Sequence, residues 1–108
     1  MSNGQSAPVS TAFQTFMTEA PAQSQAWSQM VQDLAKASAL DPKTHQLAYL
    51  AVLAALRYDS GIPFHVKMAK QAGASREEII SAVLVGLPPA GHGVTQVLPA
   101  ALAAYDSE

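Results

Sequence analysis

The chain has 108 residues, of which 49% are hydrophobic and 13% charged, and its formal net charge at pH 7 is −2. Such a chain is long enough for one modest core that buries roughly 65% of its surface, and its composition argues against disorder outside the first few residues. The charge excludes a basic surface for nucleic acid or membrane, and the absence of cysteine excludes disulfides, thiolate catalysis and cysteine metal ligands.

The N-terminal segment is polar and has neither a charged region nor an apolar region of the kind found in signal peptides. We expect residues 1–10 to be flexible and residues 11–108 to form a single helical domain. The longest apolar run is much shorter than the ~20 residues that span a bilayer. The chain is therefore expected to be a cytoplasmic protein without a membrane or nucleic-acid partner.

Two helices are expected before residue 40. Thr11 is a candidate N-cap for a short helix that ends near Ala20, and Pro21 suits the first position of the next helix. Apolar residues in this second helix recur with the spacing of one helical face, which predicts a buried stripe. The stripe comprises Trp27, Met30, Val31, Leu34 and Ala35, and Trp27 with Phe13 and Phe16 is expected to anchor a core or an interface.

A central helix follows. Asp41 and Pro42 provide an N-cap and a first-turn proline for a helix that extends from Lys43 to about Tyr58. From residue 47 to residue 56 this helix is apolar on nearly every side, so every side is expected to be buried. In so small a chain, partner subunits would help to bury it.

The next helices are separated by clear signals. Residues 59–61 interrupt the pattern, and a helix is expected from Ile62 to Gly73, where glycine suits the C-terminal turn. Ser75 and Glu78 form a capping box for a further helix that ends before Pro88.

The last apolar face extends from Val94 to Tyr105. Pro99 within it implies either a kink or a helix that starts as late as Gln96. No strand alternation or interdomain linker is visible. The fold class is therefore predicted to be all-α, with about six helices.

Three short motifs stand in order along the chain: Lys-Thr-His-Gln-Leu at 43–47, Phe-His-Val at 64–66, and Gly-Ala-Ser-Arg-Glu-Glu-Ile at 73–79. Together they resemble the carboxymuconolactone decarboxylase and alkylhydroperoxidase D superfamily. The resemblance implies an alkylhydroperoxidase D-like helical bundle that assembles into a homo-oligomer, most commonly a hexamer built as a trimer of dimers.

The best-known chemistry of that superfamily uses a glutamate, two cysteines and a histidine. In this chain the glutamate position is Gln46, the cysteine positions are Tyr58 and Gly61, and only His65 is retained. An amide is no base near neutral pH, and neither tyrosine nor glycine supports a disulfide cycle. The chain is thus not expected to be a thiol peroxidase, and it is more similar to the non-redox, decarboxylase-like branch.

That branch implies a small organic acid or lactone as ligand. His65 is the candidate catalytic residue, because an imidazole can act as general acid or base near neutral pH. Arg57 is a candidate for holding a carboxylate, and His92 for closing over the pocket. Gly61 would leave space beside His65 for a ligand. The predicted substrate-binding residues are Gln46, Arg57, Tyr58, Gly61 and His92.

Each of these roles has a structural alternative. His65 shares an apolar helix face with Ile62 and Met68, so it is also consistent with a core histidine bonded to a carbonyl. His92 is equally consistent with a solvated loop, and Tyr58 with simple packing. If these structural alternatives hold, the protein is a catalytically inert oligomer that binds a ligand or has a structural role.

Metal binding is not expected. The three histidines, His45, His65 and His92, are far apart in sequence and form no pair at helical spacing. His45 is expected to be exposed, and the glutamates at 77 and 78 are explained by helix capping. No cofactor is predicted, and the expected partners are copies of the chain and a small-molecule ligand.

Overall fold

The computed structural model describes residues 9–107, and within that range every regular element is a helix. This confirms the all-α fold class. Six α-helices have nine residues or more; residues 1–8, expected to be flexible, lie outside the described residues. The elements are α1 (Thr11–Glu19), α2 (Pro21–Ala37), α3 (Pro42–Ala55), η1 (Asp59–Gly61), α4 (Ile62–Gln71), α5 (Arg76–Leu84), α6 (Leu87–Ala90), η2 (His92–Val97) and α7 (Leu98–Asp106).

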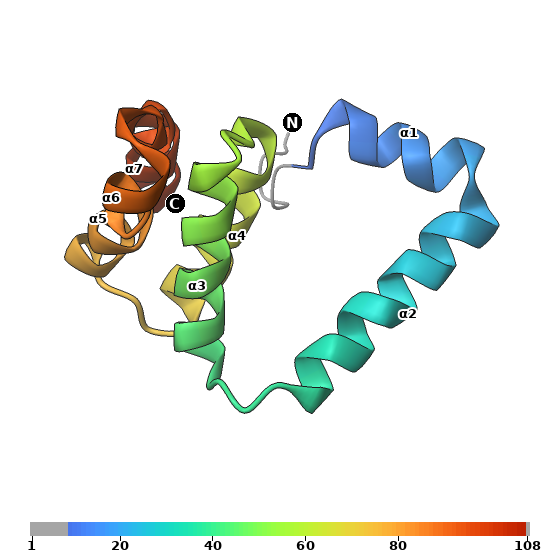
Figure 1. The fold of residues 1–108 in the computed structure, drawn as a ribbon. Coiled ribbons are helices and arrows are strands. Elements are labelled where there is room, and N and C mark those ends of the chain that lie inside the picture. Colours follow the sequence, from blue (N-terminus) through green and yellow to red (C-terminus); the bar gives the residue numbers. More distant parts are fainter. Residues whose placement is uncertain (1–8, 108) are drawn as a thin grey trace.

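Helices α1 and α2 form an arm that extends away from the remaining helices, which we call the body (Figure 1). The N-cap of α1 is Ser10, one residue before the expected Thr11, and its hydroxyl accepts a hydrogen bond from the Phe13 amide at 3.1 Å. Pro21 occupies the first turn of α2, as expected. The rings of Phe13 and Trp27 meet edge to face at 5.3 Å and join the two helices.

The apolar stripe of α2 was expected to be buried, and that expectation is wrong for the single chain. Trp27, Met30 and Leu34 are 39%, 49% and 62% exposed. Ser24 is the only buried residue of α2, because the helix packs mainly on α1 and leans away from the body (Figure 1). The stripe therefore remains available to other surfaces.

In the body, α3 packs against α4 and α5, and α7 closes the bundle against the same two helices. Every side of α3 was expected to be buried, and this expectation is wrong for the single chain, since Val52 and Leu56 are 58% and 67% exposed. Its other side supplies Leu50 to the core. The largest fully buried side chains are Leu50, Ile62, Val66, Ile79, Val83, Val94 and Val97.

The helix boundaries near the site follow the sequence signals. Gly73, with φ of 101°, ends α4 in a left-handed conformation that favours glycine. The capping box of Ser75 and Glu78 is present at the start of α5. Pro99 lies in the first turn of α7, where it needs no amide hydrogen, so the late start is correct and no kink is required.

The segment between α5 and α7 is more ordered than expected. Pro88 and Pro89 lie inside the short helix α6, and His92 begins η2 rather than lying in a flexible loop. Proline is compatible with a first helical turn, whose amides have no intrahelical acceptor. The helix expected to end before Pro88 does so at Leu84.

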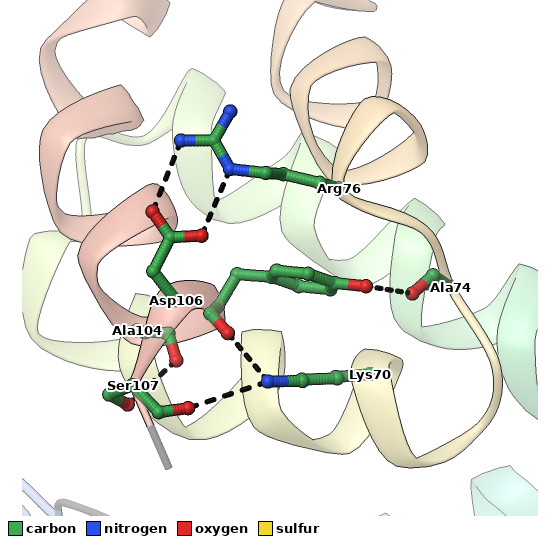
Figure 2. A network of polar contacts seen from close by, with 7 residues as sticks. Lys70, Ala74, Arg76, Ala104, Asp106 and Ser107 are labelled. Atoms are coloured by element: carbon green, nitrogen blue, oxygen red, sulfur yellow. Dashed lines mark hydrogen bonds and ion pairs between the residues drawn. The ribbon is translucent and has the colours of Figure 1, made fainter.

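Polar contacts fasten the C-terminal end of α7 to α4 and α5 (Figure 2). The Tyr105 hydroxyl donates to the Ala74 carbonyl at 3.0 Å, and the Lys70 ammonium donates to the Tyr105 carbonyl at 2.7 Å. Arg76 contacts Asp106 through two nitrogens, at 2.9 and 3.1 Å. These bonds join the end of α7 to α4, to the turn after α4 and to the start of α5.

Candidate functional site

A cavity of about 1010 Å³ lies between the arm and the body. The arm contributes aromatic side chains from α1 and α2, and the body contributes α3, η1 and α4. His65 and other residues of α4 form part of the cavity wall. The lining residues are Val9, Ser10, Ala12, Phe13, Phe16, Trp27, Val31, Ala35, Leu40, Pro42, His45, Gln46, Tyr49, Leu53, Tyr58, Ser60, Gly61, Phe64, His65, Met68, Gln71 and Ala72.

His65 is hydrogen-bonded across the α3–α4 interface. Its Nδ1 lies 3.0 Å from the Oε1 atom of Gln46. An amide oxygen only accepts hydrogen bonds, so in this arrangement Nδ1 carries the hydrogen and the neutral ring keeps its lone pair on Nε2. The residue at the superfamily's glutamate position thus contacts the retained histidine, although it is an amide here.

The ring of His65 is also held by aromatic neighbours. It stacks on Tyr49 with the ring centroids 3.9 Å apart and an angle of 16° between the planes. Phe64 meets it edge to face at 5.1 Å, and His45 lies 6.1 Å from Tyr49 on the same helix. The hydrogen bond fixes the rotation of the imidazole and the stack covers one of its faces.

Burial lowers the pKa of His65 from its ordinary value near 6.5 to about 4, because water that would solvate an imidazolium is excluded. Charge repulsion by the neighbouring His45 is a smaller cause of the same shift. At neutral pH the ring is therefore uncharged, and it presents a hydrogen-bond acceptor rather than a cation.

Tyr58 and Gly61 line the same cavity, near the start of α4. Tyr58 is 60% exposed, so it does not simply pack in the space of a missing cysteine. A Cβ atom on Gly61 would lie 3.4 Å from the side chain of Leu53, an ordinary contact. The space beside Gly61 is therefore bordered by Leu53.

Arg57 and His92 do not line this cavity. The Arg57 guanidinium donates to the carbonyls of Ala55 at 2.7 Å and Ala90 at 3.4 Å, and it lies so close to Gly93 that a Cβ atom there would collide with it. His92 is exposed. The structure thus brings together His65, Gln46, Tyr58 and Gly61, and it leaves Arg57 and His92 elsewhere.

Sequence reasoning missed the part that Tyr49 and His45 play in the site. Tyr49 follows Gln46 by three residues on one helix, a spacing that places the two side chains on the same face. That signal was hidden by the apolar run around Tyr49. His45, expected to be exposed, is partly buried at the cavity wall.

Within residues 9–107, no three histidine, aspartate or glutamate side chains gather in a way that would hold a metal ion. None of the helices described there is both long and apolar enough to cross a membrane. The groups that line the cavity are aromatic rings, hydroxyls, amides, imidazoles and aliphatic side chains.

Comparison with known proteins agrees with this architecture. A carboxymuconolactone decarboxylase family protein from Legionella pneumophila, whose crystal structure was solved in the apo form, superposes with a TM-score of 0.75 at 27% sequence identity, covering 89% of this chain and 86% of that one. No curated protein matches the chain. The sequence profile of the carboxymuconolactone decarboxylase family matches residues 21–106, and the chain therefore belongs to that family.

Proposed function

We propose that the protein binds a small organic molecule in the cavity between the arm and the body, and that His65 exchanges a proton with it. The observation that carries this proposal is the fixed imidazole at the cavity wall, held by Gln46 and stacked on Tyr49. A small-molecule site is usually lined mainly by apolar and aromatic side chains, with a small number of oriented polar groups.

The family name implies a lactone or a small organic acid as the substrate class. A decarboxylase-like reaction would need a group that moves a proton at the reacting carbon, and His65 is the group available for it. Its low pKa keeps the ring neutral at pH 7, so His65 can take a proton from the ligand as a weak general base and return it within the same cavity. The chemistry would use no thiol, because the chain has no cysteine.

The experiment is a thermal-shift screen of small lactones, hydroxylated rings and carboxylic acids, repeated on His65→Ala. A ligand present at 100 times its Kd stabilises the folded state by ~2.7 kcal/mol, which is readily measured. Hits that stabilise the wild type and not His65→Ala would support the proposal. A screen in which both proteins respond alike would contradict it.

We also propose that the chain assembles with copies of itself, as the resemblance implies, most commonly as a hexamer. What supports this is the exposed apolar surface on α2 and on the outer side of α3. Leu34 is 62% exposed and Val52 is 58% exposed, and other large hydrophobic residues close to each in sequence are exposed as well. The second candidate function is a structural oligomer that binds no ligand. The thermal-shift screen distinguishes it from a ligand-binding protein, because a structural oligomer would give no stabilising hits.

A further inference from the structure

The cavity is lined by nearly all the aromatic residues of the chain. Every phenylalanine, tyrosine and tryptophan except Tyr105 contributes to it. Among the lining residues there is no lysine, arginine, aspartate or glutamate in the part of the chain that the structure describes. An aromatic cavity with no formal charge favours a ligand that is itself uncharged and carries a flat ring system.

A carboxylate would find no counter-ion among the described residues that line this cavity. Arg57, which the sequence suggested for holding a carboxylate, is bonded to the carbonyls of Ala55 and Ala90 and does not line the cavity. The His65 imidazole, uncharged at neutral pH, supplies no positive charge either. Desolvating an anion without a paired cation is strongly unfavourable, so the lining discriminates against free acids.

The ring nitrogen that His65 leaves available to a ligand is an acceptor. Nδ1 of His65 is engaged by the Gln46 oxygen, which leaves Nε2, with its lone pair, free of any hydrogen bond from residues 9–107. The stack on Tyr49 keeps the ring in this orientation. A ligand gains a hydrogen bond there only if it donates one.

We infer that the ligand is an uncharged, ring-bearing molecule with a hydroxyl group, which donates its hydrogen to Nε2 of His65 while its rings lie among the aromatic side chains. This rests on the proposed function, since it names the class of molecule for the same cavity. It narrows the class implied by the family name by setting free carboxylic acids aside, and with them the decarboxylase-like reaction, so the proton that His65 exchanges is that of the ligand's hydroxyl group.

Three matched probes test this by calorimetry at pH 7.5: 2-naphthol, its methyl ether, and 2-naphthoate. The naphthol should bind about tenfold more tightly than either of the others, which corresponds to ~1.4 kcal/mol, the value of one hydrogen bond in an apolar site. The methyl ether keeps the rings and loses the donor, so this comparison does not depend on any variant. Equal binding of naphthol and its ether would overturn the inference.

The variant Gln46→Glu provides a reversal. A carboxylate on Nδ1 raises the pKa of His65 and favours the imidazolium, whose Nε2 then donates. The probes are compared at pH 6 instead of pH 7.5, because a raised pKa can populate the imidazolium there. The preference should shift toward 2-naphthoate by about tenfold, whereas Gln96→Glu, an exposed change on η2 outside the cavity, should leave it unaltered. An unchanged preference in Gln46→Glu would contradict the role assigned to Nε2.

The outcomes separate the two proposals. If 2-naphthoate binds wild-type protein as tightly as 2-naphthol, and both lose affinity in His65→Ala, the ligand class is wrong and the His65 site stands. If none of the probes binds, or if binding is the same in His65→Ala, the proposed function fails together with the inference. A second copy of the chain filling the cavity would produce that last result.

Discussion

The imidazole of His65 and the ring of Tyr49 lie face to face, 3.9 Å apart, and this contact joins α4 to α3 at the wall of the cavity. The stack has two consequences. It contributes to the packing of the two helices, and it excludes water from one face of His65, which is part of the burial that keeps the ring neutral. Stability and proton affinity at the site are therefore linked through one side chain.

Replacing Tyr49 should thus change both properties. We expect Tyr49→Ala to lower the free energy of unfolding by about 2–3 kcal/mol, near the lower end for removing a large aromatic group, because Tyr49 is only partly buried. The pKa of His65 should rise toward its ordinary value as water enters. Urea unfolding and an NMR titration of the His65 ring measure the two effects. Tyr49→Phe keeps the stack, and a similar loss in that variant would contradict the explanation.

The low pKa of His65 predicts a pH dependence of stability. Its pKa is about 4 in the folded chain and near 6.5 when unfolded, so the unfolded state binds the proton first as the pH falls. The free energy of unfolding should decrease between pH 6.5 and pH 4. The pKa difference sets an upper bound of about 3 kcal/mol for the contribution of His65, and partial solvation of the ring makes the actual contribution smaller. Above pH 6.5 this contribution is constant.

The variant His65→Leu isolates this effect. Carboxylates such as Asp41, Glu78 and Asp106, whose pKa values are lowered by their hydrogen-bond partners, also lose stabilisation in acid. They act equally in both proteins, so the difference between wild type and His65→Leu reports His65. The urea midpoint should fall less between pH 7 and pH 5 in His65→Leu than in the wild type. Parallel falls would show that His65 is not the group responsible.

The exposed apolar surfaces predict self-association. Light scattering on a sizing column at micromolar concentration should detect an oligomer, and Leu34→Glu or Val52→Glu should shift it toward monomer, since each places a charge on an exposed apolar position. Gln96→Glu adds the same charge on an exposed polar position and serves as the control. A stable wild-type monomer would refute the prediction.

The capping box predicts a local effect on α5. Ser75 accepts a hydrogen bond from the Glu78 amide at 3.0 Å, and the Glu78 carboxylate accepts one from the Ser75 amide at 2.9 Å. Ser75→Ala should lower the free energy of unfolding by about 1 kcal/mol. Ser81→Ala, an exposed change inside the same helix, should have little effect in thermal or urea unfolding. Equal destabilisation by both would rule out capping as the cause.

The absence of cysteine predicts that the protein shows no dihydrolipoamide- or thioredoxin-linked reduction of peroxide above background. Such a cycle needs a thiolate that is reversibly oxidised, and no other side chain replaces it. A coupled assay of peroxide consumption tests this. Saturable turnover that persists after repurification would show that another mechanism operates.

Local signals were enough to predict most of the helices. Pro42 in a first turn, Gly73 at a C-terminus and the Ser75 capping box act within a few residues, so sequence and structure agree there. That Gln46 and His65 border one site was expected from the family resemblance, but the hydrogen bond between them was not predicted. Pro99 left two alternatives, and the packing of α7 against α4 and α5 is consistent with the later start.

Other features depend on contacts between segments that are distant in the chain. The apolar spacing of α2 indicated a buried face but could not identify what covers it, and in the single chain Leu34 remains exposed. Periodicity likewise could not place Arg57 outside the cavity or Tyr49 on the ring of His65. Helix formation and capping are local free energies and can be read from neighbouring residues. The composition of a cavity, and with it the charge state of His65, arises only when separate helices exclude water from the same space.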